Sequence, residues 1–169
     1  MKLPLISLVC ASLILSAAAQ AGEVTLNQRY SGNSLPTMVD TNGDGRTASH
    51  GNFYVRGGPG QATVDSFNEF TDFAPYFVDG CDLRAGLVAQ TYVETFQDGS
   101  MLFYQATEAF LCLNLSTFVI DFEAKGVLTG GTGRFAGASG TWVNVGKGFS
   151  AGVEMNAYEG TLKGTIVLP

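Results

Sequence analysis

The segment 40–45 reads Asp-Thr-Asn-Gly-Asp-Gly and has the composition of a cation-binding turn. Oxygen-bearing side chains recur at Asp40, Asn42 and Asp44, and Gly45 permits a sharp turn, as in the first half of a calcium loop. The second half is missing, because the twelfth position is Gly51, where an EF-hand carries a bidentate glutamate. The alternative is a surface turn in which these side chains bond their own backbone. The sequence thus offers calcium as its one candidate cofactor.

Four acidic residues and the single histidine are the remaining candidates for acid–base chemistry. They are Glu94, Glu108, Asp121, Glu123 and His50. Paired carboxylates could serve glycoside hydrolysis, but Asp121 and Glu123 share the strand face opposite the apolar side chains and are expected to be solvated. Burial of Glu94 or Glu108 would indicate a functional role. His50 stands in a polar stretch without a nucleophile motif and is interpreted as solvated. We predict no catalytic residue and assign no ligand-binding residue.

The first 21 residues have the order of a secretory signal peptide. Lys2 precedes an uncharged apolar run over 3–15, and small residues follow. The run is too short for a spanning helix, which needs about 20 apolar residues. Cleavage before Gly22, or alternatively near Gln20, would release a secreted or periplasmic protein with no membrane attachment. Residues 22–169 are expected to form a single domain.

Two cysteines remain after the leader, Cys81 and Cys112. In an oxidising compartment an even pair is usually bridged, so we predict one disulfide between them. A zinc site is the competing interpretation, but two thiols without nearby histidines or further cysteines cannot complete a tetrahedron.

Period-two alternation of apolar and polar residues predicts an all-β protein. It is clearest over 118–125, where Phe118 and Ile120 begin the apolar face, and over 161–168. Further strands are predicted near 23–28, 51–55, 61–73, 83–96, 100–109, 141–145 and 148–155, a total of seven to ten. Asp98-Gly99 is the best hairpin turn, and 30–50 is interpreted as a long surface loop. Aromatic residues between 67 and 77 are expected to pack inside. Short strands at this spacing indicate a barrel or, alternatively, a β-sandwich.

A glycine-dense corner follows the strand at 118–128. It reads Thr-Gly-Gly-Thr-Gly-Arg-Phe-Ala-Gly-Ala-Ser-Gly-Thr over 129–141. The stretch 118–141 resembles the corresponding part of the allene oxide cyclase and dirigent barrel families. The resemblance implies an antiparallel eight-stranded barrel with Phe135 plugging one end. It also implies that the chain can assemble with copies of itself into a homo-oligomer. It carries over no activity, because the cyclase residues cannot be placed on this chain and a fold does not fix a function.

Composition excludes several functional classes. The formal charge of −6 disfavours nucleic acid and anionic lipid as partners. The pattern Gly131-x-Gly133-x-x-Ala136 is not followed by a helix-forming segment, so it does not predict a dinucleotide site. With 12 Phe and 6 Tyr, the interior is expected to be aromatic. We therefore expect a non-enzymatic exported barrel that binds a small apolar or amphipathic molecule or self-associates. The alternatives are an isomerase or cyclase of the allene oxide cyclase type, and a structural envelope or matrix component.

Overall fold

The computed structural model describes residues 22–40, 43–150 and 156–169. Nine strands and one 3-10 turn make up this part of the chain: β1 Gly22–Pro36, β2 Ser49–Gly58, β3 Ala62–Phe70, β4 Ala74–Val78, β5 Cys81–Phe96, β6 Met101–Leu113, β7 Val119–Thr132, η1 Gly133–Phe135, β8 Ser139–Ser150 and β9 Asn156–Leu168. The predicted signal peptide and Asn42 of the predicted calcium loop lie outside the described residues. Among the described residues, no helix is long and apolar enough to cross a bilayer.

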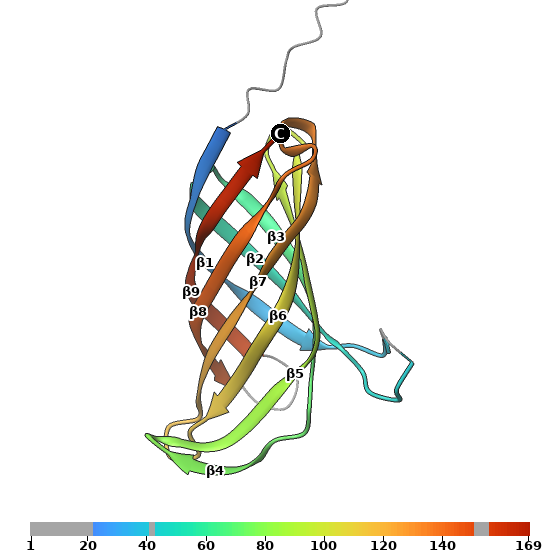
Figure 1. Ribbon diagram of the computed structural model, residues 1–169. Coiled ribbons are helices and arrows are strands. Elements are labelled where there is room, and N and C mark those ends of the chain that lie inside the picture. The colour runs from blue at the N-terminus through green and yellow to red at the C-terminus, as the bar shows by residue number, and fades with distance from the viewer. Residues whose placement is uncertain (1–21, 41–42, 151–155) are drawn as a thin grey trace, which may run out of the picture.

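The strands form one antiparallel sheet that closes on itself. Neighbours follow the order β3-β2-β1-β9-β8-β7-β6-β5-β4, and an additional β3–β5 pairing joins the two sides (Figure 1). Closure through β3 and β5 leaves β4 outside, so the barrel itself has eight strands. The predicted eight-stranded antiparallel barrel is confirmed, and the alternative of two packed sheets is wrong.

Alternation along the strands places apolar side chains inside the barrel. In β7, Ile120, Ala124 and Leu128 are buried, while Asp121 and Glu123 between them are exposed. A period of two is what a strand with one face on a core requires. The carboxylates are therefore exterior groups, as predicted.

The glycine corner closes one end of the barrel, which we call the capped end. Gly133 and Gly137 flank the turn η1 with φ of 59° and 75°, a backbone conformation that other residues rarely adopt. The turn directs Phe135 inward, where it is 2% exposed and packs against Phe96 with ring centroids 4.8 Å apart. The predicted plug is confirmed.

The opposite end carries β4, and we call it the β4 end. Here Cys81 at the start of β5 is bonded to Cys112 of β6, with 5.4 Å between their Cα atoms. The predicted disulfide is confirmed. Ala74 and Pro75 of β4 pair with the first residues of β5.

Several predicted boundaries are wrong. β1 continues to Pro36, so the loop predicted over 30–50 is limited to 37–48, and β8 is one strand where two were predicted. Phe118 precedes β7 in a turn with φ 56° and is 60% exposed instead of facing the core. β4 was not predicted. The aromatic residues expected to pack inside near it are exposed, with Phe77 at 73%.

Candidate ligand cavity

A cavity of about 170 Å³ occupies the interior toward the β4 end. Its lining comes mainly from residues near the ends of strands, such as Ser34 of β1, Ser49 of β2 and Asn156 of β9. The aromatic lining residues are Tyr30, Phe53, Phe70, Tyr92, Tyr104, Phe122 and Tyr158. The amide and hydroxyl lining residues are Ser34, Ser49, Ser66, Asn68, Gln90, Asn144 and Asn156. The interior is thus both aromatic and polar at this end.

One wall of the cavity is a group of rings lying over glycines. Tyr30 stands edge-on to Phe53 at 5.5 Å between centroids, and Phe122 stands edge-on to Tyr158 at 5.6 Å. An added Cβ on Gly146 would collide with Tyr30 and Phe122, and similar collisions with rings arise at Gly148 of β8 and Gly160 of β9. Glycine is therefore needed at these inward positions because the rings occupy the space of a side chain.

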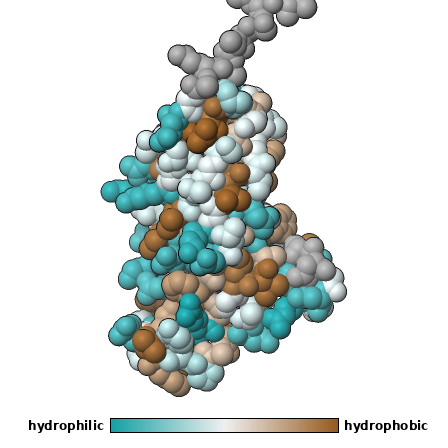
Figure 2. Space-filling view, viewed as in Figure 1, coloured by the Kyte–Doolittle hydropathy of each residue, from teal (hydrophilic) through white to brown (hydrophobic). Residues whose placement is uncertain are grey.

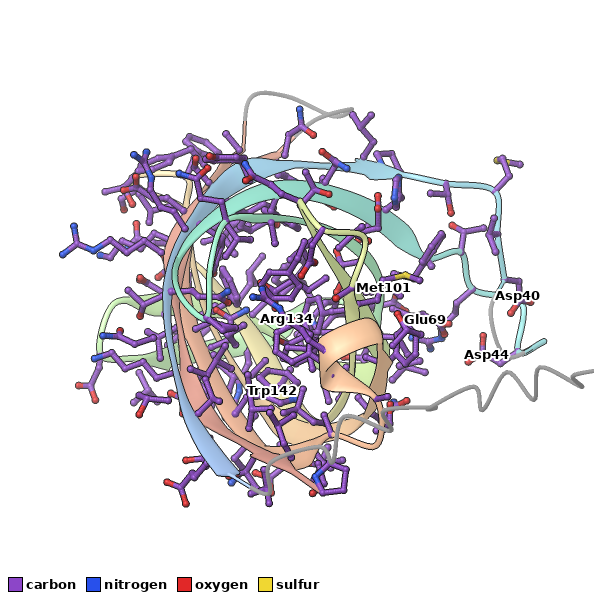
Figure 3. The ribbon with its side chains drawn as sticks, turned by 90° about the horizontal axis from the view of Figure 1, so that it is seen from above. Asp40, Asp44, Glu69, Met101, Arg134 and Trp142 are labelled. Atoms are coloured by element: carbon purple, nitrogen blue, oxygen red, sulfur yellow. A yellow bond between two sulfur atoms is a disulfide. The ribbon has the colours of Figure 1, made fainter. Side chains whose placement is uncertain are left out.

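A second aromatic group forms the floor of the cavity, between it and the capped end. Tyr92 and Tyr104 both stand edge-on to Trp142, with centroids 5.4 Å and 6.1 Å away. The Trp142 indole lies inside the ring of strands (Figure 3) and donates a hydrogen bond to the Val127 carbonyl at 3.1 Å. These contacts fix the two tyrosine rings that face the cavity.

A buried carboxylate lies behind this floor. Glu94 is 0% exposed, and its two oxygens accept hydrogen bonds from Gln28 Nε2 at 2.5 Å and from the Tyr104 hydroxyl. Burial raises the pKa of Glu94, and these two hydrogen bonds partly oppose that rise. Tyr104 lines the cavity, whereas Glu94 itself is behind it. Of the two carboxylates whose burial would indicate a functional role, Glu94 is the buried one.

A chain of hydrogen bonds through Asn68 and Ser66 holds the side chain of Gln90 in place. Gln90 Nε2 donates to Asn68 Oδ1 at 2.7 Å, and Asn68 Nδ2 donates to Ser66 Oγ at 2.9 Å. Gln90 Oε1 and the Tyr92 hydroxyl are buried and find no hydrogen-bond partner among the described residues. Buried polar groups are nearly always paired, so these two atoms call for an explanation.

Asn144 lies between two of the tyrosines. Its Oδ1 accepts a hydrogen bond from the Tyr30 hydroxyl at 2.8 Å. The same amide is close enough to Tyr92 to lower its pKa slightly, against the larger effect of burial, which raises it. Burial also raises the pKa of Tyr158 to about 12, so the tyrosines are neutral at physiological pH.

The other acid–base candidates lie on the outside of the barrel. Glu108 pairs with Lys125 at 2.8 Å between Oε2 and Nζ, and both side chains are largely exposed. His50 Nε2 lies 3.2 Å from Asp65 Oδ1, also with both side chains partly exposed. Ordinary surface pairing accounts for these contacts.

The predicted calcium loop stands outside the barrel wall (Figure 3). The Asp40 carboxylate accepts hydrogen bonds from the backbone N–H groups of Gly43 and Gly45 at 2.6 and 2.8 Å, as the surface-turn interpretation requires. Carboxylate oxygens of Asp40, Asp44 and Glu69 nevertheless lie within 4.8 Å of one another. Glu69 belongs to β3 and is 1% exposed. Calcium binding by this loop stays a prediction.

Linear spacing could not have indicated the partners of these groups. Gln28 is 66 residues from Glu94, and Gln90 meets Asn68 across the seam between β3 and β5. The usable signal was the inward position of Glu94 in a predicted strand. The polar residues in the second half of β1 gave no such signal, because the pattern from Tyr30 onward is that of a loop.

Comparison of the chain with protein-family models, with curated proteins and with solved structures gave no match. The barrel is therefore established by the structure, and kinship with the allene oxide cyclase and dirigent families stays a prediction.

Proposed function

We propose that this barrel is a non-enzymatic binding protein that holds a small apolar or amphipathic molecule in the cavity at the β4 end. The observation that carries the proposal is the cavity itself, about 170 Å³ between aromatic walls inside an otherwise packed barrel. An engineered apolar cavity of about 150 Å³ accepts benzene, so this space suits a molecule of about one ring.

The composition of the lining supports binding over simple packing. Core side chains normally fill their space to the density of an organic crystal. Phe122 instead stands edge-to-face to Tyr158 and lies tilted against Tyr30 around unfilled space. Small polar side chains such as Ser66 point inward where larger apolar ones would complete a core.

The test combines extraction with a cavity-filling variant. Purified protein is extracted with organic solvent and the extract is analysed by mass spectrometry, while displacement of an apolar fluorescent dye is titrated. Val64→Phe places a ring in the cavity and should abolish dye binding. Val143→Phe makes the same change on an exposed outer position and should leave binding intact. Absence of any extracted molecule together with equal dye signals from the two variants would refute the proposal.

An isomerase or cyclase is the second candidate, and one observation favours it. Glu94 is buried, its pKa is raised, and it contacts the cavity-lining Tyr104. A buried carboxyl with a raised pKa that contacts a tyrosine hydroxyl is a group able to transfer protons. Incubating the extracted molecule with the protein and following its isomers by NMR tests this candidate. If the protein converts the molecule, and Glu94→Gln abolishes the conversion but not the binding, the enzymatic function is established. If no isomer forms, the enzymatic function is excluded for that molecule.

Export and self-association are proposed alongside binding. The disulfide is compatible with an oxidising compartment, and N-terminal sequencing of the protein purified from its host should begin at Gly22. Hydrophobic residues form separate patches among hydrophilic ones on the face shown in Figure 2. Sedimentation across a range of protein concentrations would show whether the barrels associate.

A further inference from the structure

Among the described residues, no charged side chain lines the cavity. None of the lining residues is Asp, Glu, Lys, Arg or His, and burial keeps the lining tyrosines neutral by raising their pKa values. Behind the floor, Arg134 lies against the rings of Phe96 and Phe135 and pairs with Asp98 at 3.4 Å. A charged ligand would lose its hydration without gaining a counter-charge from the lining. The cavity therefore selects against ions of either sign.

Two residues that line the cavity each carry a buried polar atom with no hydrogen-bond partner among the described residues. Gln90 is 4% exposed, and because its Nε2 donates to Asn68, its amide orientation is set and Oε1 remains as an acceptor. The Tyr92 hydroxyl lies near the Asn144 amide, which partly opposes the rise of its pKa on burial, but no acceptor for the hydroxyl proton is found among the described residues. Gln90 and Tyr92 are two residues apart on β5, so both side chains extend from the same face of the strand.

The remaining walls favour a flat ring. Phe122, Tyr158 and Tyr30 present ring faces and edges to the space, and aromatic groups prefer such offset or edge-to-face contacts. A saturated hydrocarbon would fill the volume but would leave Gln90 Oε1 and the Tyr92 hydroxyl without partners.

On these grounds, and resting on the proposed binding function, we propose the chemical class of the ligand. It is an uncharged single-ring molecule that carries an N–H or O–H donor for Gln90 Oε1 and an oxygen acceptor for the Tyr92 hydroxyl, the pairing that an aromatic carboxamide supplies. The ring lies against Phe122 and Tyr158, and the polar group points toward β5.

Three probes of nearly equal shape test the assignment by isothermal titration or ligand-observed NMR. Benzamide is neutral with a donor and an acceptor, benzoate is its charged analogue, and ethylbenzene has neither charge nor polar group. Benzamide should bind at least about tenfold more tightly than ethylbenzene, because a site built for polar contacts rejects a ligand that leaves them unpaired. Benzoate should bind most weakly.

Equal or tighter binding of benzoate would overturn the inference of a neutral ligand. Equal or tighter binding of ethylbenzene would overturn the role of Gln90 and Tyr92, while leaving the proposed binding function in place. Failure of all three probes would also overturn this inference, and the solvent extract would then decide whether the binding function falls with it.

Tyr92→Phe sharpens the test because it removes only the hydroxyl. It should lower the affinity for benzamide about tenfold or less and leave the affinity for ethylbenzene unchanged. Tyr54→Phe is the matched control, since Tyr54 is exposed on the outer face of β2, and it should change neither affinity. Equal affinities of Tyr92→Phe and the unaltered protein for benzamide would remove Tyr92 from the site.

Discussion

The two ends of this barrel are built from the same strands but are filled in opposite ways. At the capped end, Phe135, Phe96 and Leu102 pack into a solid core beneath the turn η1. At the β4 end, the inward positions of those strands carry tyrosines, amides and serines around a cavity. The difference teaches that a closed sheet can keep its shape with a solid core at one end only, so that the other end can enclose a cavity.

A matched pair of substitutions on β6 gives the largest expected effect. Leu102→Ala removes a fully buried side chain at the capped end and should lower the free energy of unfolding by about 3 to 5 kcal/mol. Leu111→Ala, on the same strand beside the cavity, should cost only about 1 to 2 kcal/mol, because its side chain already borders empty space. Urea denaturation with the disulfide intact measures both. Equal losses would contradict the contrast between the two ends.

The disulfide belongs to the β4 end and should matter most there. Replacing Cys81 and Cys112 together by alanine opens a loop closed across 31 residues and should lower the free energy of unfolding by about 3 to 4 kcal/mol. Amide hydrogen exchange should accelerate in β4 and the first residues of β5 before it does at the capped end. Uniform acceleration along the barrel would show that the two ends do not differ in local stability.

Glu94, at the boundary between the two halves, predicts a pH dependence. Because burial raises the pKa of Glu94, the folded state holds its proton more tightly than the unfolded chain, where the carboxyl titrates near about 4.3. The stabilisation is complete below that pH and is lost as pH rises, by up to about 1.4 kcal/mol per pH unit until the folded pKa is passed.

Glu94→Gln should therefore become more stable relative to the unaltered protein as the pH increases from 5 to 7. The exposed Glu108→Gln serves as the control and should show no such trend. Thermal melts across this pH range measure the difference between the variants. A constant difference for Glu94→Gln would mean that the carboxyl ionises as easily inside as in water.

Calcium gives the smallest expected effect and concerns the loop beside the β4 end. If Asp40, Asp44 and Glu69 hold the ion, calcium at ten times its Kd should add about 1.4 kcal/mol to the free energy of unfolding. Asp44→Asn should remove the increment, whereas Asp72→Asn, an exposed carboxylate outside the cluster, should keep it. Identical melting temperatures with chelator and with millimolar calcium would reject the site.

The sequence predicted the barrel best where its interior is apolar. Alternation identified β7 and β9, and the glycines around Phe135 indicated the corner, because an apolar core imposes a period of two on each strand. The disulfide was predicted from two cysteines that follow a predicted export signal. These features depend on the capped end or on covalent chemistry.

The same reasoning failed at the β4 end for a physical reason. The second half of β1 turns Gly32 and Ser34 inward, so it reads as a loop although it is a strand facing the cavity. Gly146 made β8 look like two strands, but it is there to admit Tyr30 and Phe122. Where the interior is an aromatic and polar cavity, the hydrophobic period disappears, and its disappearance marks the cavity.

The way β5 divides its 16 residues has one more consequence. Residues 87–96 complete the circle against β3, while 83–84 pair with β4 on that side of β5 and with β6 on the other. The segment between Phe70 and Cys81, which includes β4, thus lies outside the closed ring of eight strands, and the barrel wall closes without it. This segment could therefore be lengthened, or could accept an inserted domain, without breaking the hydrogen bonds between β3 and β5 that close the barrel.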